Sequence, residues 1–403
     1  MKDNIQCLLN DKFLNRIISI EYVVTQKCQN ECVYCYRRFL HHSSKEIFVP
    51  PERIRIFTEN LIQMFNLSKD FFTKRQAELF GGEPMLDLDH FNEVLKVIQS
   101  YRYKRILVPT NGRLVSVSRL SVIEKILKEN QNLFLSFSVD SPYQDKNRPL
   151  SKFGILNNYP EEIDYDKLFY IAKKYKFGFH PMLYLETASE WFNTFKFFFD
   201  HGVIPYLLEV RHPSSKNNMI EGVKQLIKIR QFLDDVELPF EQKRHTNTVY
   251  PSTVPRGLGC SALTSISISP NGDVPFCHRL SDKPYIKMNL MDKTFDLDKI
   301  IMWTSAFDFR NHPKCVSCPI RNLCSGPCIG MNYEYWGNPW LPYNEFCLYT
   351  KLKIYSMSLY FDDWKKELLK SFTDKKQYDI LETEIMDEFE DVSSFNELIN
   401  RTL

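Results

Sequence analysis

Six short apolar runs, rich in β-branched and aromatic residues, recur through the first half of the chain, and they constrain the fold more than any other feature. They span residues 17–25, 77–82, 105–112, 133–141, 178–187 and 203–212. Stretches with a helical spacing of apolar residues separate them, such as 88–101 and 117–130. Strands that alternate with helices indicate parallel βαβ units, which close into a full or partial barrel with functional groups at the carboxyl ends of the strands. The sequence therefore predicts an α/β domain.

The pattern changes after residue 235. Residues 236–257 are polar, contain three prolines and read as a linker. Seven cysteines then follow with little regular periodicity, as in a small domain held together by metal. The tail returns to helical spacing, with an acidic stretch at 382–391 that we expect to be a solvated helix face. One face of the tail is predicted to carry Ile354, Met357, Phe361, Trp364 and Leu368. The predicted organisation is an N-terminal segment (1–15), a barrel (16–235), a linker with the cysteine-rich domain (236–350) and a helical tail (351–403).

Charge and hydropathy exclude several classes of partner. The formal net charge is +2, which gives no argument for a nucleic acid. The chain starts without an apolar signal core, and no later apolar run reaches the roughly 18 residues that span a bilayer. We therefore expect a soluble, cytoplasmic protein without a membrane partner. Eleven cysteines in such a chain indicate metal ligands or catalytic groups rather than disulfides.

Three of these cysteines lie in one short loop directly after the first predicted strand. Cys28, Cys32 and Cys35 have the spacing C-x3-C-x2-C. Zinc sites usually show pairs of C-x2-C, although a triplet could still serve zinc. A 4Fe–4S cluster has four irons, so three thiolates would leave one iron open for a substrate or cofactor.

The triplet resembles the signature of the radical S-adenosylmethionine (SAM) family, including the aromatic Tyr34 before the third cysteine. Three strand-end segments resemble further motifs of that family: "GGEP" (81–84), "TNG" (110–112) and "SVD" (138–140). Each could also be an ordinary strand-end turn, and Arg148 resembles a family arginine but could equally be a surface residue. The resemblance implies a SAM site formed by Tyr34, Gly81, Gly82, Glu83, Pro84, Asn111, Ser138, Asp140 and Arg148.

The resemblance also implies the chemistry. In this family the open iron of a 4Fe–4S cluster binds SAM, and one electron cleaves SAM to a 5′-deoxyadenosyl radical that abstracts hydrogen from an unactivated C–H bond. The cofactor supplies the reaction, and the barrel orients it and excludes water. An electron donor such as flavodoxin or ferredoxin is an expected partner.

The later cysteines resemble the seven-cysteine pattern of the SPASM domain, which binds two auxiliary 4Fe–4S clusters. By that resemblance the outer cluster is held by Cys315, Cys318, Cys324 and Cys347. The inner cluster is held by Cys260, Cys277 and Cys328, which leaves it one thiolate short. The expected cofactors are therefore SAM and three 4Fe–4S clusters. The fold class implied is a partial (β/α)6 TIM-type barrel, followed by a small Fe–S-bound SPASM domain and a helical C-terminal tail.

Relatives with both cysteine arrays mostly modify peptides or proteins. The resemblance implies a radical SAM/SPASM oxidoreductase that modifies a peptide or protein side chain, maturing a ribosomal peptide (a RiPP) by forming a cross-link. Two other activities stay open: a sulfatase-maturase-like formylglycine-forming enzyme, and a carbohydrate or small-molecule radical dehydrogenase. A non-catalytic iron–sulfur scaffold is the remaining class, and the intact SAM motifs argue against it.

The residues that perform the chemistry are harder to predict. His278 stands directly after Cys277, where sulfatase maturases have an aspartate base, and histidine can also take a proton near neutral pH. It could instead be a histidine hydrogen-bonded to backbone. Further candidates at late strand ends, which could equally satisfy one another inside the barrel, are His180, Tyr184, Glu209 and Arg211.

The expected substrate partner is a peptide or protein. Many peptide maturases carry a leader-binding domain before the barrel, and the first predicted strand here begins at residue 17. A separate leader-binding protein, or direct capture at the barrel mouth, is therefore expected.

Overall fold

The computed structural model of the chain falls into two compact units. The first unit contains Met1–Val139, Asn147–Gly178 and Ser261–Phe307, and the second contains Asp140–Lys146, Phe179–Cys260 and Asp308–Leu403. The structure describes residues 14–38, 48–68, 70–151, 162–210, 212–236, 238–239, 246, 248–251, 264–281, 283–300, 312–324, 326, 328–372, 374 and 376–400.

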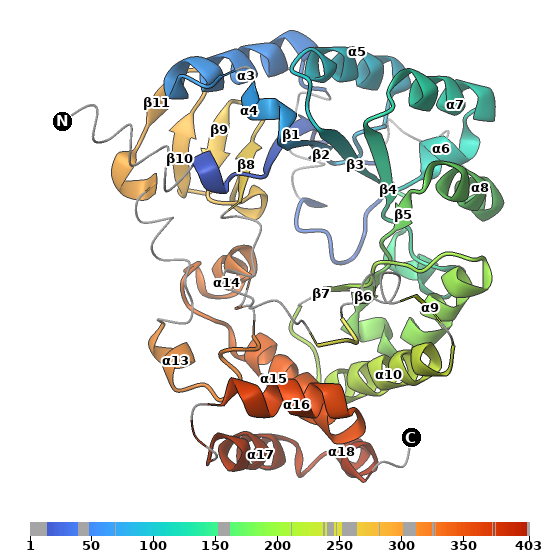
Figure 1. The fold of residues 1–403 in the computed structure, drawn as a ribbon, viewed down its shortest axis with the longest axis vertical. Helices are drawn as coiled ribbons and strands as arrows, with labels where there is room; N and C mark the ends of the chain where they lie inside the picture. The colour runs from blue at the N-terminus through green and yellow to red at the C-terminus, as the bar shows by residue number, and fades with distance from the viewer. Residues whose placement is uncertain are drawn as a thin grey trace. The chain divides into compact units, whose positions relative to one another are not determined.

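A six-stranded sheet forms the centre of the first unit (Figure 1). Its strands are β1 (Ser19–Thr25), β2 (Gln76–Gly81), β3 (Arg105–Thr110), β4 (Leu133–Phe137), β5 (Gly178–Phe179) and β8 (Ser265–Ile268). Their order is β5-β4-β3-β2-β1-β8, and the pairings β8–β1, β1–β2, β2–β3 and β3–β4 are all parallel. All seven residues of β1 are buried, as expected of a strand in a parallel sheet covered on both faces. The predicted α/β partial-barrel fold is confirmed.

The sixth strand of this sheet is not the one that the sequence pattern predicts. The run at 203–212 contains β7 (Leu208–Val210), which pairs in parallel with β6 (Met182–Tyr184) in a separate two-stranded sheet. The sheet gains β8 instead, from the region that we predicted to be irregular. The sequence of β8, "SISI", is short and half polar, so it is a weak strand signal. In the structure β8 pairs residue by residue with Ser19–Tyr22, and all four of its residues are buried.

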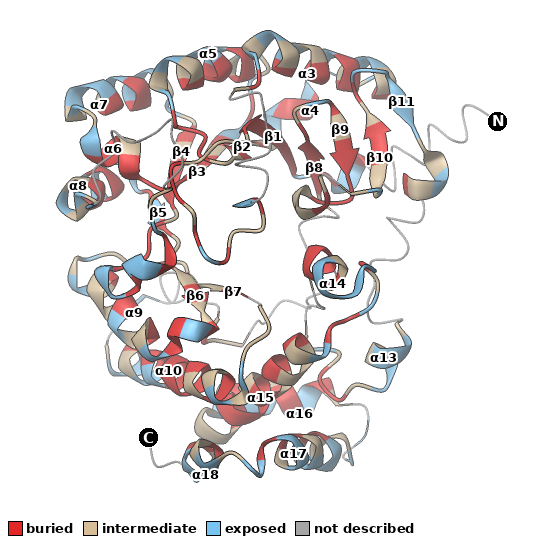
Figure 2. Cartoon of the chain, turned by 180° about the vertical axis from the view of Figure 1, so that it is seen from behind, coloured by how far each residue is buried: buried red, intermediate tan, exposed pale blue. Residues whose placement is uncertain are grey.

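Helices cover the outer side of the sheet in the first unit. They are α3 (Pro51–Phe65), α4 (Asp70–Thr73), α5 (Leu88–Gln99), α6 (Arg113–Val117), α7 (Leu120–Glu129) and α8 (Tyr165–Tyr175). Figure 2 shows that their buried faces turn toward the strands. Local signals set where two of them begin, because Asp87 caps α5 by accepting from the His90 amide at 2.7 Å and Asp164 caps α8 in the same way.

A small antiparallel sheet follows β8 in the first unit. It contains β9 (Asp273–Pro275), β10 (Ile286–Asn289) and β11 (Thr294–Phe295), in the order β11-β10-β9. Gly272 makes the turn before β9 with a φ of 87°, which glycine adopts without strain. Cys277 follows β9 in extended conformation, and His278 opens the short helix η6 (His278–Leu280).

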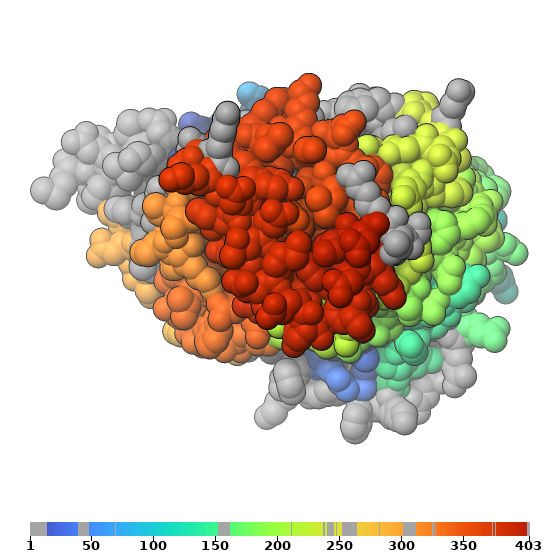
Figure 3. Space-filling model, turned by 90° about the horizontal axis from the view of Figure 1, so that it is seen from below, coloured from blue at the N-terminus to red at the C-terminus, as the bar shows by residue number. Residues whose placement is uncertain are grey.

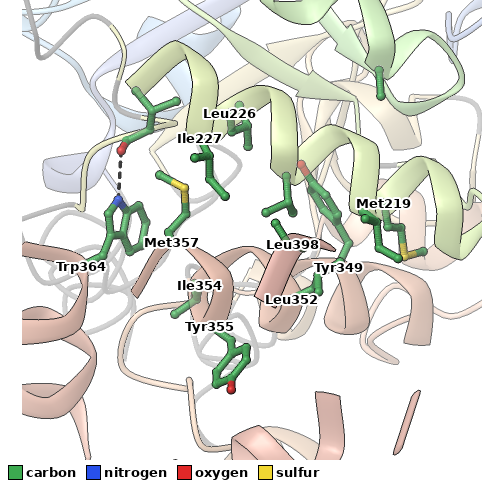
Figure 4. Packing of buried hydrophobic residues seen from close by; sticks show 14 of the residues in the cluster. Met219, Leu226, Ile227, Tyr349, Leu352, Ile354, Tyr355, Met357, Trp364 and Leu398 are labelled. Atoms are coloured by element: carbon green, nitrogen blue, oxygen red, sulfur yellow. Dashed lines mark hydrogen bonds between the residues drawn. The ribbon is translucent and has the colours of Figure 1, made fainter. Parts of the chain in front are cut away.

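The second unit is mainly helical. Its helices include α9 (Trp191–Asp200), α10 (Lys216–Asp235), α13 (Pro313–Val316), α14 (Ile329–Trp336), α15 (Asn344–Tyr360), α16 (Asp362–Ser371), α17 (Lys376–Phe389) and α18 (Ser393–Ile399). Leu226 and Ile227 of α10 lie in one buried cluster with Ile354 and Met357 of α15 (Figure 4). The tail helices together form one face of this unit (Figure 3).

The prediction of a helical tail is confirmed, with one break. Phe361 has φ −130° and ψ 122°, so the chain is extended there and α15 and α16 are separate helices. Ile354, Met357, Trp364 and Leu368 are buried on both sides of the break. The Trp364 indole also donates to the Val249 carbonyl at 2.9 Å (Figure 4).

The acidic stretch predicted at 382–391 also behaves as expected. It lies largely in α17, which buries Leu381, Ile385 and Phe389 and turns Asp387 and Glu388 to solvent. None of the helices in the described part of the chain combines the length and apolar character needed to cross a bilayer.

Candidate active site

The loop that follows β1 carries the cysteine triplet. Cys32 is buried, whereas Cys28 and Cys35 are partly buried. The loop is held from the side of residues 147–150, because the Glu31 amide donates to the Pro149 carbonyl at 2.8 Å and the Val33 amide to the Asn147 carbonyl at 2.9 Å. Burial raises the pKa of the Cys28 thiol, and the negative charges of Cys32 and Cys35 raise it further. The three thiols therefore lie close enough to act on one another electrostatically.

Two glycines let this loop lie close to the end of β2. The Gly82 amide donates to the Thr25 carbonyl at 2.9 Å, and the Glu83 amide to the Lys27 carbonyl at 2.8 Å. A Cβ on Gly81, whose φ is 146°, would lie 1.9 Å from the Thr25 carbonyl oxygen, and one on Gly82 would lie 2.0 Å from that of Lys27. The family resemblance implies a SAM site at these glycines, and in the structure their lack of a side chain admits the backbone of the cysteine loop.

Glu83 joins two of the predicted motifs. It is 2% exposed, and its carboxylate accepts from the Thr110 hydroxyl at 2.7 Å, the Asn111 amide at 2.7 Å and the Met85 amide at 3.0 Å. Burial raises the pKa of Glu83 to about 7, although these hydrogen bonds act in the opposite direction. The ends of β2 and β3 are therefore connected through one buried carboxyl, beside buried Pro84.

Asn111 extends this network to the cysteine loop. Its side-chain amide donates to the Cys28 sulfur at 3.8 Å, and its carbonyl oxygen accepts from the Gln29 side chain at 3.2 Å. The structure thus brings together Cys28, Asn111 and Glu83, which the sequence placed in three separate motifs.

Arg148 and Tyr34 also lie at the cysteine loop. Arg148 is 7% exposed, its guanidinium donates to the Cys32 sulfur at 3.9 Å, and it lies 5.4 Å from the centre of the Tyr34 ring. The surface-residue alternative for Arg148 therefore does not describe its environment.

The fourth-strand motif is divided between the two units. The Ser138 amide donates to the Thr110 carbonyl at 2.7 Å, next to the Glu83 network in the first unit. Asp140 is fully buried in the second unit, where its carboxylate accepts from the Met182 amide at 2.8 Å.

His278 has a partner that the sequence did not indicate. Its Nδ1 lies 3.1 Å from the carboxylate of Glu21, a residue of β1 that is almost entirely buried. Its ring stacks on Tyr36, with centroids 5.5 Å apart, and meets Phe80 edge-on at 5.3 Å. The backbone-bonded alternative is not what the structure shows, since this ring nitrogen faces a carboxylate.

Glu21 belongs to a buried polar cluster that sequence reasoning missed. Burial alone would raise the pKa of Glu21, but the hydrogen bond and charge of His278 lower it below its ordinary value. Glu78, opposite Glu21 in β2, has a pKa raised to about 8, first by burial and then by the charge of Glu21. Burial lowers the pKa of Lys287 on β10 to about 7, against the charges of Cys277 and Glu21. The signal in the sequence was one glutamate in each of two predicted strands, Glu21 and Glu78. Only the register of β1 with β2 shows that these two residues lie opposite each other.

The remaining catalytic candidates lie in the second unit. Glu209 accepts from the Tyr349 hydroxyl at 2.7 Å and from the Lys353 ammonium at 2.6 Å, which favours its structural alternative. His180 meets the Tyr206 ring edge-on at 5.2 Å. Burial and the charge of Glu186 raise the pKa of Tyr184. Arg211 lies outside the described residues.

Four later cysteines gather in the second unit. Burial raises the pKa of Cys315 to about 11, and the charges of Cys324 and Cys318 add to it. Burial likewise raises the pKa of Cys347 to about 12, and the charges of Cys324, Cys318 and Cys315 raise it further. These are the four residues predicted to hold the outer auxiliary cluster.

The inner set of three is not assembled within one unit. Cys277 lies in the first unit and Cys328 in the second, where Cys328 packs with Cys324 and Cys347 against Met331, Tyr343 and Phe346. Cys260, like Cys7, lies outside the described residues. Among the side chains that the structure describes, no three potential ligands lie close enough to bind one metal ion. In a 4Fe–4S cluster each thiolate binds a separate iron, so its ligands lie farther apart than those of a single ion.

The comparisons with known proteins define the class. Residues 22–198 match the radical SAM superfamily, a range that contains the cysteine triplet and the ends of β2, β3 and β4. This match identifies residues 22–198 as a radical SAM enzyme domain.

The particular relatives extend the similarity beyond that range. Radical SAM cyclopropyl synthase TigE from Paramaledivibacter caminithermalis is 25% identical over 344 residues, covering 80% of this chain and 70% of that protein. The structure of native anSMEcpe with bound AdoMet matches with a TM-score of 0.61 at 18% identity, covering 88% of this chain and 98% of that one. SuiB from Streptococcus suis, bound to S-adenosylmethionine, matches with a TM-score of 0.53 at 14% identity, covering 86% and 80%. Because both structures are less than 25% identical to this chain in sequence, they show that the chain shares their fold and no more.

Proposed function

We propose that this chain is a radical SAM oxidoreductase that modifies a peptide or protein side chain, and that its product is a cross-linked ribosomal peptide. The observation that carries the enzymatic part is the buried network from Cys28 through Asn111 to Glu83, which joins the cysteine loop to the ends of β2 and β3. The peptide substrate is supported by the fold shared with anSMEcpe, one structure of which holds the Cp18Cys peptide.

The residues of the first unit fit a cluster with SAM. Cys28, Cys32 and Cys35 offer three sulfurs from one loop, and Asn111 and Arg148 already donate to two of them. Such donors stabilise thiolate ligands. When bound, the cluster and SAM supply a carbon-centred radical that can abstract hydrogen from an unactivated C–H bond.

Glu83 has the right chemistry for the ammonium group of SAM. It is a buried carboxyl whose pKa burial has raised, so a cation beside it would favour its ionised form. Its three hydrogen bonds fix its orientation. Tyr34 and Arg148 would border the same ligand, with Arg148 supplying positive charge for a carboxylate. The glycines keep the loop and strand close enough for both groups to reach it.

His278 is proposed as a proton acceptor for the substrate. Glu21 engages Nδ1, which leaves Nε2 as the ring nitrogen able to take a proton and fixes the ring orientation. The side chain is 33% exposed, so it is not sealed inside the protein. A base here would help a substrate group to deprotonate as it is oxidised.

The later cysteines are proposed to hold auxiliary clusters. Cys315, Cys318, Cys324 and Cys347 would bind the outer one, supported by their mutual electrostatic effects. Cys260, Cys277 and Cys328 would bind the inner one. A flavodoxin or ferredoxin would deliver electrons.

The first test is SAM turnover by reconstituted, anaerobically reduced enzyme. Wild-type protein should release 5′-deoxyadenosine, and replacing Cys28, Cys32 and Cys35 together by alanine should remove about four irons per chain and all turnover. Replacing Cys315 and Cys318 is the matched control, because it should remove about four irons but leave the SAM motifs intact. Turnover in the triplet variant would refute the assignment.

The second test identifies the product. Enzyme, SAM and the short peptides encoded beside this gene are incubated together, and the peptides are analysed by mass spectrometry. A loss of two hydrogens with a fragmentation gap between two residues supports a cross-link. Unmodified peptides together with a modified sugar would refute the peptide proposal.

A second candidate function is formylglycine formation on a protein cysteine or serine. The observation that favours it is the Glu21–His278 pair, which places a carboxylate-supported base directly after Cys277. An aldehyde on a cysteine- or serine-containing peptide, detected with a hydrazide probe, would select this candidate over the cross-link.

A further inference from the structure

Arg37 is a buried cation at the end of the cysteine loop, two positions after Cys35. It is 2% exposed, and none of its three guanidinium nitrogens has a hydrogen-bond partner in the described structure. The next residue, Arg38, has the opposite environment, since it is 48% exposed and lies 3.9 Å from the Glu31 carboxylate. The chain therefore buries one arginine of an adjacent pair and leaves the other at the surface.

The packing around Arg37 does not compensate its charge. The guanidinium lies 5.6 Å from the centre of the Phe80 ring, which can attract a cation but accepts none of its five N–H groups well. Arginine does not give up its proton in proteins, so burial cannot neutralise it. A buried charge without a partner is strongly unfavourable. The site is therefore expected to contain an anion in the working enzyme.

The described carboxylates at the loop are already engaged. Glu31, in the loop itself, accepts from the Ser151 hydroxyl at 2.8 Å and lies 3.9 Å from Arg38. Glu21 is bonded to His278, and Glu83 accepts three hydrogen bonds from other groups. Among the described groups at the loop, the cysteine sulfurs are the negative charges that remain for Arg37.

Cys35 is the cysteine of the triplet that lies nearest to Arg37 along the chain. The turn that contains Arg37 starts at Cys35, because the Arg38 amide donates to the Cys35 carbonyl at 3.2 Å. Two further arginines lie beside the same loop. Arg148 donates to the Cys32 sulfur, and Arg279 lies over the Tyr36 ring at 4.5 Å. Arg37 differs from both because its own nitrogens have no partner among the described residues.

We propose that Arg37 is the buried counterion of the cluster held by Cys28, Cys32 and Cys35, and that it makes the reduction of this cluster easier. The inference rests on the proposed function, because it needs a cluster at the triplet. Three thiolates and a 4Fe–4S core of charge 2+ give a net charge of −1, and the added electron makes it −2. A fixed positive charge stabilises the reduced form more than the oxidised form, and net charge is one of the quantities that set cluster potentials.

The test compares Arg37→Gln with Arg37→Lys, and uses Arg38→Gln as the matched surface control. Each reconstituted protein is titrated electrochemically in the absence of SAM, and the reduced cluster is followed by electron paramagnetic resonance. The spectrum of the triplet alanine variant is subtracted to remove the auxiliary clusters. At a fixed potential, the ratio of reduced to oxidised cluster should fall about tenfold in Arg37→Gln. It should change much less in Arg37→Lys and stay at the wild-type value in Arg38→Gln.

Two outcomes would overturn the proposal. One is an Arg37→Gln protein with an intact cluster and an unchanged potential without SAM, which would mean that Arg37 serves another anion. If Arg37→Gln instead fails to retain iron, the lysine variant decides. Iron retained by Arg37→Lys supports the charge argument, whereas iron lost from both variants, with folding intact by circular dichroism, contradicts it. A triplet alanine variant that keeps all its iron would refute the cluster assignment itself, so the two failures are distinguishable.

Discussion

Gly82→Ala should damage the cysteine loop without touching any sulfur. The added Cβ would lie 2.0 Å from the Lys27 carbonyl oxygen and 2.4 Å from its carbon, whereas real Cβ atoms essentially never approach closer than 3.0 Å. The loop backbone must therefore move by about 1 Å or more, and no flexible side chain can absorb the shift. The hydrogen bond from the Glu83 amide to the same carbonyl, 2.8 Å long, would be lost or distorted. Overpacking of this kind costs about 1–3 kcal/mol of unfolding free energy.

The assay separates the loop from the rest of the chain. Thermal unfolding of the apoprotein by circular dichroism should show a midpoint lower by roughly 2–12 °C, from about 2–4 °C per kcal/mol in domains of this size. Reconstituted Gly82→Ala should lose SAM-dependent turnover and up to about four irons per chain. Gly178→Ala is the matched control, because nothing lies within 4 Å of a Cβ built there. Wild-type stability, iron content and turnover in Gly82→Ala would refute the reasoning that the loop has no room to move.

Three further predictions follow from buried charges. The pKa of Glu78 is raised from 4.5 to about 8 by burial and by Glu21, so the native carboxyl keeps a proton that the unfolded chain releases. Apoprotein stability should therefore fall as pH rises from about 4.5 to about 8, and Glu78→Gln should flatten this slope in denaturant titrations. His278→Gln should keep the iron content and the release of 5′-deoxyadenosine. It should yield less modified product per SAM cleaved, measured by liquid chromatography, and an unchanged yield would mean that His278 has only a structural role. Glu209→Gln should lose about 2–3 kcal/mol of unfolding free energy, less than for a fully buried pair, because it leaves the partly buried Lys353 without its ion pair. SAM turnover should be kept, and loss of turnover at normal stability would make Glu209 functional.

The two glutamate variants each have a control that shares their chemistry. Glu93→Gln removes an exposed carboxylate paired with Lys96 in the first unit, and should leave the pH slope unchanged. Asp200→Asn removes an exposed partner of Lys196 in the second unit, and should change stability by less than about 1 kcal/mol. A fall in stability that persists in Glu78→Gln would mean that another carboxyl with a raised pKa controls it, such as Glu83, whose pKa burial raises to about 7.

The cysteine loop and its neighbours could be predicted because their signals are local. Cys28, Cys32 and Cys35 identify themselves by spacing, and parallel strands bring their carboxyl ends to one edge, which is why Glu83 and Asn111 meet. The helix starts at Asp87 and Asp164 follow from capping chemistry alone. Contacts that are set by a residue and its local motif can therefore be predicted from the sequence alone.

The residues that were missed depend on contacts between distant segments. Arg37 follows the signature, but nothing in "CYRR" distinguishes a buried arginine from its exposed neighbour. Glu21 alternates with apolar residues in a strand, a position that sequence reasoning would assign to either face. Its partner His278 is 257 positions away. Only the register of β1 with β2 and β8 shows that Glu21 faces a buried polar cluster.

The insertion of β8 explains how a late segment completes the first unit. Because β8 pairs with Ser19–Tyr22 of β1, the chain that leaves it through β9 passes directly beside the strand that carries Glu21. Phe276, Cys277 and His278 follow β9, and the His278 ring nitrogen reaches the Glu21 carboxylate of β1 at 3.1 Å. A boundary drawn at residue 235 separates segments that the sheet joins. The four-residue strand β8, "SISI", is weakly signalled in the sequence, but its pairing with β1 matters for the proposed function. Without this pairing, His278 would have no buried carboxylate to orient it.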